Sequence, residues 1–121
     1  MPVLGAVFAP ALGVRGRLFA GAAPAVAGGG GNAAATAWVD DDAGRRSIRC
    51  RKAPPKGLTV VGSRSHGDAA ALDAFLARYL QGRTVAAMAN AGSSLKLCLL
   101  AAGEADLYPR LGRTMEWDIA A

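Results

Sequence analysis

The feature that most constrains the fold of this chain is an alternation of strand-like and helix-like segments after the Pro54-Pro55 pair. Short apolar runs are typical of strands, and apolar residues recurring at helical spacing are typical of helices. Three strands are expected, at Leu58–Gly62, Thr84–Met88 and Ala105–Tyr108. Two helices are expected between them, at Ala69–Leu80 behind an Asp68 N-cap and at Ser94–Ala102. This order predicts an α/β layer.

The residues before the proline pair have the pattern of hairpins. Val3–Ala9 and Arg17–Ala20 are expected to pair, since proline and glycine interrupt the chain between them. Two further strands, Ala37–Val39 and Ser47–Cys50, are expected around a polar turn at Asp40–Gly44.

The ends of these patterns divide the chain into two expected parts. A strand and hairpin region occupies residues 1–57, and an α/β region occupies residues 58–121. The Gly/Ala tract Pro24–Ala35 predicts a surface loop within the first part. Thr114–Ala121 has the pattern of the opening of one more helix.

The composition and charge indicate a packed protein with an anionic partner. Hydrophobic residues make up 52% of the 121 residues and charged residues 19%, as in globular proteins. A net charge of +5 favours a phosphate ester, a nucleic acid or a membrane surface as partner. We interpret one basic cluster as a solvated hairpin face and expect no nucleic acid polymer as partner. Its members are Arg45, Arg46, Arg49, Arg51, Lys52 and Lys56.

The cysteines and the apolar start of the chain bear on its location. Cys50 and Cys98 are far apart, and with His66 as the single histidine there is no plausible zinc set. Two free thiols predict a reducing, cytoplasmic location. The first thirty residues have no basic residue before their apolar run and are interrupted by glycine and proline, unlike a secretory leader. No run reaches the ~18 apolar residues of a membrane span, so we expect a soluble chain without an integral membrane segment.

The segment Gly92-Ser93-Ser94-Leu95-Lys96 is the most informative for function. It follows an expected strand and opens an expected helix that is apolar nearly all round, as buried helices are. Lys96 is the only charge of that helix and lies in its first turn, where the helix dipole disfavours a cation. A bound anion would explain this position. A lysine that reaches past the helix end to solvent would explain it equally well.

Other polar residues after the expected strands are weaker candidates. Asp118 lies among apolar neighbours and is either a capping residue or a ligand for a hard cation such as Mg²⁺. His66 follows the Leu58–Gly62 strand and Arg110 follows Ala105–Tyr108, at the strand ends where ligands gather in α/β sheets. Arg110 could fork onto a phosphate. The Asp40-Asp41-Asp42 run is interpreted as a solvated turn and not as a metal site, because consecutive turn residues point in different directions.

Three stretches resemble a known family. They are "LTVVGSRSH", "AGSSLKLCLLAAGEADLYPRLGRTMEWD" and the closing "WDIAA". They resemble the second half of bacterial 3'(2'),5'-bisphosphate nucleotidases of the inositol monophosphatase superfamily. The opening "PVLGAVFAPALG" resembles strands that follow the first metal motif of those enzymes. "WDxAA" is shared across the superfamily, and its combination with "GSSLK" and "YPR" narrows the resemblance to the nucleotidases.

The resemblance implies a layered αβαβα sugar-phosphatase fold with a mixed sheet and a cytoplasmic hydrolase of sulfur metabolism. It further implies a magnesium-dependent phosphomonoesterase, which removes the 3'-phosphate of 3'-phosphoadenosine 5'-phosphate. It implies that Asp118 ligates Mg²⁺ beside the substrate ester oxygen and that His66 lies nearby. The residues implied to hold the nucleotide and its second phosphate are Gly92, Ser93, Ser94, Lys96 and Arg110.

The chain departs from the family pattern in its metal ligands. The Asp-Pro-x-Asp-Gly-Thr motif of these enzymes does not occur here, and no glutamate precedes Glu104. Relative to the pattern, the N-terminal catalytic half is missing and the last helix is cut short. We therefore expect a fragment that is inactive alone, with Asp118 as its one metal carboxylate. Two alternatives stay open: a non-catalytic module that binds nucleotides or polyanions, and a phosphatase acting on inositol phosphates.

Overall fold

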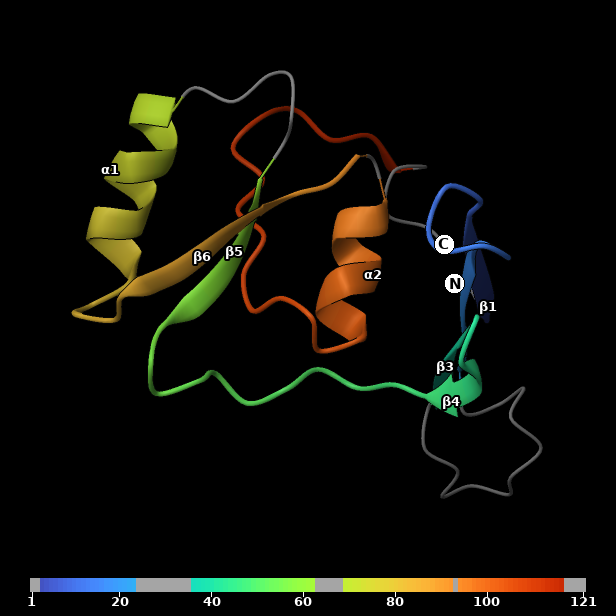
Figure 1. Cartoon of the computed structure of the whole chain (residues 1–121). Helices are drawn as coiled ribbons and strands as arrows, with labels where there is room; N and C mark the ends of the chain where they lie inside the picture. The colour runs from blue at the N-terminus through green and yellow to red at the C-terminus, as the bar shows by residue number, and fades with distance from the viewer. Residues whose placement is uncertain (1–2, 24–35, 63–68, 93, 117–121) are drawn as a thin grey trace. The chain divides into compact units, whose positions relative to one another are not determined.

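The fold is that of a computed structural model, which describes residues 3–23, 36–62, 69–92 and 94–116. The chain divides into two compact units, Met1–Arg49 with Met115–Ala121, and Cys50–Thr114. Figure 1 shows their strands and helices, and each unit is described by itself. The predicted loop at 24–35 and most of the predicted last helix lie outside the described residues.

The first unit is a four-stranded antiparallel sheet in the order β1-β2-β3-β4. Its strands are β1 (Leu4–Ala9), β2 (Arg17–Ala22), β3 (Thr36–Asp41) and β4 (Gly44–Ser47). The first hairpin is confirmed, with Leu4 opposite Ala22 and Ala9 opposite Arg17. Phe19 and Val39, which are paired neighbours on β2 and β3, are the buried residues of this sheet.

The second hairpin turns later and more tightly than predicted. Asp40 and Asp41 are strand residues, and the turn is Asp42-Ala43, so the partner strand is Gly44–Ser47 and not Ser47–Cys50. The Asp41 Oδ1 accepts a hydrogen bond from the Ala43 N–H at 3.0 Å, the side-chain turn that aspartate favours. Gly44 follows with φ +90°, a conformation open to glycine.

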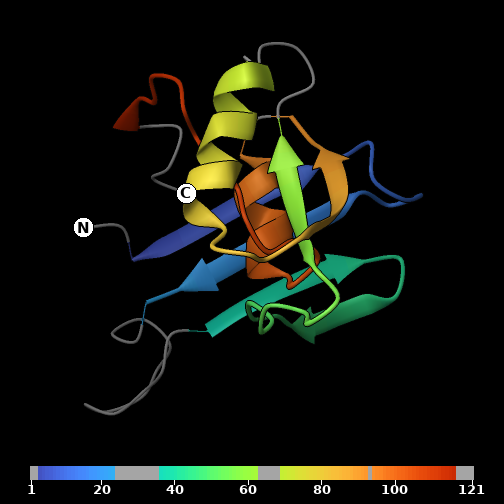
Figure 2. The ribbon, with the colours of Figure 1, turned by 90° about the vertical axis from the view of Figure 1, so that its left-hand side faces the viewer.

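The second unit is an α/β layer, which confirms the predicted class. It contains β5 (Leu58–Gly62), α1 (Ala69–Tyr79), β6 (Val85–Asn90) and α2 (Leu95–Ala101) in that order. β5 and β6 pair in parallel and lie side by side with arrowheads pointing the same way (Figure 2). The two views place α1 on one face of this pair and α2 on the other.

The core of the second unit lies between β5 and α2. Val60 and Val61 are fully buried, and Val61 is clustered with the buried Ala91 and Ala105. The half-buried residues packed against this cluster are Leu95, Leu99, Leu100 and Tyr108. α1 contributes no buried residue, although Phe75 and Tyr79 stack on each other with ring centroids 4.6 Å apart.

The predicted third strand is not a strand but a single bridge. Leu107 pairs in parallel with Val60, its carbonyl accepting a hydrogen bond from the Val61 N–H at 2.8 Å. Two residues later Pro109 has no N–H to continue a ladder. The segment 105–108 therefore runs beside β5 and contacts it through one bridge, without forming a further strand of the sheet.

Gly57 marks the close approach of β5 to β6. Its φ is +120°, and a Cβ there would lie 2.8 Å from Thr84 Oγ1 and 2.9 Å from the Thr84 carbonyl oxygen. The Leu58 N–H donates to the same carbonyl at 2.8 Å, so the two strands start together. Neither helix in the described part of the chain is long and apolar enough to cross a membrane.

Candidate functional site

Lys96 is buried in the second unit. α2 begins at Leu95, so Lys96 lies in its first turn as predicted, and it is 3% exposed. Among the residues that the structure describes, it is the one charged residue that is buried as a whole, backbone included. A lysine reaching past the helix end to solvent is therefore the wrong interpretation. Lys96 Nζ lies 5.2 Å from the centroid of the Tyr108 ring, within the range of a cation–π interaction.

Arg110 contacts the hydroxyl of Tyr108. It is exposed, and its Nη1 donates to the Tyr108 hydroxyl oxygen at 3.4 Å. Its Nε donates to Thr114 Oγ1 and its Nη2 to the Arg113 carbonyl oxygen, both at 2.9 Å. The structure thus brings Lys96 and Arg110 together through one aromatic side chain. The sequence patterns do not assign a binding role to Tyr108. The signal that indicates it is the Tyr-Pro-Arg order at the end of an expected strand.

Gly92 and Ser94 precede α2, which begins at Leu95. Gly92 is exposed, and Ser94 is the N-cap residue with φ −63° and ψ −15°. The Ser94 hydroxyl makes no capping hydrogen bond, and its carbonyl accepts from the Leu97 N–H at 3.0 Å. Ser93, His66 and Asp118 lie outside the described residues.

The end of α2 directs the chain back towards β5. The Gly103 N–H donates to the Leu100 carbonyl and the Glu104 N–H to the Leu99 carbonyl, at 3.0 and 2.9 Å. Gly103 has φ +71°, so this is the left-handed glycine termination common at helix ends. Asp106 and Leu107 follow against β5, and Tyr108 comes next, so this turn fixes where the aromatic ring lies.

Asp106 fixes the same segment from the other side. Its carboxylate accepts two hydrogen bonds from Arg51, from Nε and Nη2, each at 2.7 Å, and a third from the Thr59 N–H at 2.7 Å. The Asp106 side chain is 3% exposed. The Arg51 fork, opposed by burial, holds the pKa of Asp106 below its ordinary value. Arg51, predicted as part of a solvated cluster, therefore has a structural role 55 residues away in sequence.

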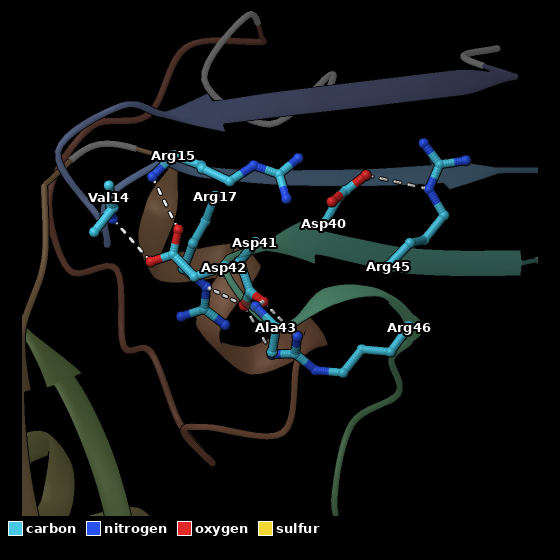
Figure 3. Close-up of polar contacts among 9 residues, drawn as sticks. All are labelled: Val14, Arg15, Arg17, Asp40, Asp41, Asp42, Ala43, Arg45 and Arg46. Atoms are coloured by element: carbon cyan, nitrogen blue, oxygen red, sulfur yellow. Dashed lines mark hydrogen bonds and ion pairs between the residues drawn. The ribbon is translucent and has the colours of Figure 1, made fainter.

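The aspartate run forms three separate pairings, drawn in Figure 3. Asp40 lies 3.5 Å from Arg45, its direct cross-strand partner. Asp41 accepts two hydrogen bonds from Arg46 at 2.7 and 2.9 Å. Asp42 accepts from the Val14 and Arg15 N–H groups at 2.8 and 2.9 Å, across the two hairpins.

These pairings correct the prediction for the run and for part of the basic cluster. Asp40 and Asp41 are not turn residues, and Asp41 is mostly buried, with its side chain 13% exposed. Arg45 and Arg46 are exposed, as predicted, and also neutralise these carboxylates. The run therefore stabilises the first unit, because its three side chains are aimed at different partners on β4 and in the turn of the first hairpin.

The first unit should lose one ion pair on acidification. The Arg46 fork is the main cause that lowers the pKa of Asp41 from 3.8 to about 2. Because the folded state holds this proton less tightly than the unfolded state, the stabilisation is complete above pH 4 and disappears as the pH falls towards 2. We expect Asp41→Asn to lower the thermal unfolding midpoint at pH 5 and to leave it unchanged near pH 2. An equal difference at both pH values would contradict the assignment.

The described carboxylates do not form a magnesium site. No group of three or more His, Cys, Asp or Glu side chains comes together among the residues that the structure describes. Asp41 and Asp106 are each held by an arginine fork, which uses the oxygens that a hard cation would need. Both cysteines are free thiols, Cys50 exposed and Cys98 buried.

Comparison with known proteins identifies the family of this chain. The 3'(2'),5'-bisphosphate nucleotidase CysQ of Escherichia coli (strain K12) is 39% identical over 120 residues, 99% of this chain and 40% of that protein. CysQ of Salmonella typhimurium (strain LT2) is 41% identical over the same share of each.

A solved structure has the same fold. The crystal structure of CysQ from Bacteroides thetaiotaomicron, a bacterial member of the inositol monophosphatase family, superposes with a TM-score of 0.70 at 26% identity. The match covers all of this chain and 45% of that one, so this chain spans less than half the length of these relatives. The profile of the inositol monophosphatase family matches residues 1–121, and the chain belongs to this family.

Proposed function

We propose that this chain carries the phosphate-binding part of a 3'(2'),5'-bisphosphate nucleotidase, an enzyme that converts 3'-phosphoadenosine 5'-phosphate to AMP and phosphate. The observation that carries the proposal is the buried Lys96 beside Tyr108, with Arg110 bonded to the same tyrosine. An ammonium kept away from water attracts an anion more strongly than an exposed one, so the buried Lys96 suits a phosphate ligand. The similarity to CysQ proteins over 99% of the chain supports the same assignment.

The two cations differ in a way that suits a ligand with two phosphates. Lys96 is nearly excluded from water, so its attraction to a phosphate is screened little. Arg110 is exposed, and its guanidinium bonds to neutral oxygens of Thr114, Arg113 and Tyr108, which a phosphate would replace as the stronger acceptor. We assign Lys96 and Arg110 to phosphate binding and, from the family resemblance, also assign Gly92, Ser93, Ser94 and His66 to substrate binding.

Asp118 is the carboxylate that we assign to Mg²⁺, the cofactor that would polarise the phosphate ester. This assignment rests on the resemblance of "WDIAA" to the superfamily motif. One carboxylate binds Mg²⁺ weakly. We therefore propose that the 121-residue chain binds the nucleotide but releases no phosphate by itself.

Two measurements on the purified chain test this proposal. Calorimetry without metal should give one-site binding of 3'-phosphoadenosine 5'-phosphate, tighter than AMP and tighter than inositol 1-phosphate. Preference for inositol 1-phosphate would favour the inositol-phosphate alternative, and no binding of any of the three would refute the proposal. Phosphate release with Mg²⁺ should equal that of Asp118→Ala, and release above that control would refute the proposed inactivity.

A further inference from the structure

We infer that Tyr108 is a positioning residue that orients both phosphate-binding cations, through the face of its ring for Lys96 and through its hydroxyl for Arg110. The inference rests on the proposed function for its consequence, ligand affinity, but the orientation itself can be tested without any ligand. It assigns one side chain two separable tasks.

The ring has the environment that this task requires. Lys96 Nζ lies 5.2 Å from the ring centroid, and Lys96 is 3% exposed, so water competes little with the aromatic face for the ammonium. The ring also packs against the buried cluster of Val61, Ala91 and Ala105. Because this cluster joins β5 to the start of α2, the ring cannot shift without moving the core.

The hydroxyl contacts Arg110 at the edge of the unit. The Nη1–Oη distance of 3.4 Å is long for a hydrogen bond, and the other two guanidinium donors are bound at 2.9 Å by Thr114 and Arg113. The hydroxyl therefore adds a third, weaker contact to a guanidinium that Thr114 and Arg113 already hold, and it contributes little energy to the fold. Removing the hydroxyl should affect Arg110 and leave Lys96 in place.

The backbone supports this role for Tyr108. The Asp106 and Leu107 N–H groups both donate to the Thr59 carbonyl, and the Arg51 fork holds the Asp106 carboxylate. Tyr108 follows directly, and Pro109 fixes the backbone φ after it. A residue on so constrained a segment can hold two neighbours in a set geometry.

Chemical labelling of the whole chain separates orientation from folding. Amine acetylation read by peptide mass spectrometry reports Lys96, with the exposed Lys52 and Lys56 as internal references. Thiol reactivity of the buried Cys98, on the same helix, reports local unfolding against the exposed Cys50. Tyr108→Leu should raise acetylation of Lys96 several-fold while Cys98 stays protected. Tyr108→Phe, which keeps the ring, should leave Lys96 as in the parent chain.

Two labelling results would overturn the inference. One is unchanged Lys96 acetylation in Tyr108→Leu, which would mean that the ring does not hold the ammonium. The other is a parallel rise of Cys98 reactivity, which would mean that Tyr108 only maintains the fold. Neither result depends on nucleotide binding, so the orientation can fail while the proposed function stands, and the reverse.

Affinity for 3'-phosphoadenosine 5'-phosphate tests the consequence. Tyr108→Phe should weaken binding about threefold in the parent chain and not at all in an Arg110→Met background, as expected for one weak hydrogen bond. Tyr108→Leu should weaken it roughly tenfold and also lose part of its effect in a Lys96→Met background. Additive effects in both backgrounds would show that Tyr108 acts on neither cation.

Discussion

Replacing Lys96 with methionine is expected to lower the association constant for 3'-phosphoadenosine 5'-phosphate by roughly 100-fold, as for the loss of about 3 kcal/mol from a buried charge pair. The variant should stay folded. Lys96 is 3% exposed, and an unbranched apolar side chain of similar length fills the same space without the cost of burying an ammonium. Loss of affinity with retained stability identifies a residue kept for binding.

A matched control is available in the same unit. Lys52 is exposed, so Lys52→Met removes the same charge from the chain without touching the buried position. It should change the association constant by less than about twofold at physiological salt, where charges beyond about 8 Å are screened. Calorimetry and urea unfolding on both variants provide the comparison. Equal losses of affinity in the two variants would mean that net charge alone attracts the nucleotide.

Removing the carboxylate of Asp106 is expected to destabilise the second unit by about 3 kcal/mol. Asp106→Ala leaves the Thr59 N–H and the two Arg51 donors without their acceptor, and hydrogen bonds to a buried charge are worth more than neutral ones. Urea unfolding followed by far-ultraviolet circular dichroism measures the change. Asp73→Ala is the control, because Asp73 is an exposed carboxylate on α1 and its removal should change stability by less than about 0.5 kcal/mol.

The same substitution links the fold to the site. Tyr108 follows Asp106 by two residues, and the Arg51 fork holds the intervening backbone on β5. In conditions where Asp106→Ala remains folded, we expect Lys96 acetylation to rise as in Tyr108→Leu. Full stability in Asp106→Ala would show that the fork does not anchor this segment.

The elements with strong local signals were predictable from the sequence. β5 was predicted with its observed bounds, and α1 and α2 within one residue at each end. Apolar periodicity and glycine or proline near the ends act within a few residues, so a single sequence contains them. The first hairpin was predictable for the same reason. The second was displaced because the Asp41 side chain, not backbone propensity, decides where the chain turns.

The candidate site could be predicted only in part. The sequence alone indicated that Lys96 lies in the first turn of an apolar helix, where a cation is unfavourable, and that Arg110 follows the strand-like segment Ala105–Tyr108. Both features are local in sequence. Whether Lys96 reaches solvent depends on what covers it, and the burial in the structure removes that alternative. The contact of Tyr108 with Lys96 joins α2 to the segment after it and exists only in the folded chain, whereas Arg110 contacts Tyr108 from two residues away.

By itself, the sequence determined the order of β5, α1, β6 and α2, the placement of a cation in the first turn of α2, and the motifs that mark the family. Only the tertiary structure decided the partner of each charged group. Arg51 pairs with Asp106, and Lys96 lies over the ring of Tyr108. The physical reason is range. Hydrophobic periodicity and turn chemistry act between near neighbours, whereas a fork across 55 residues and a buried ammonium exist only once packing has excluded water from them.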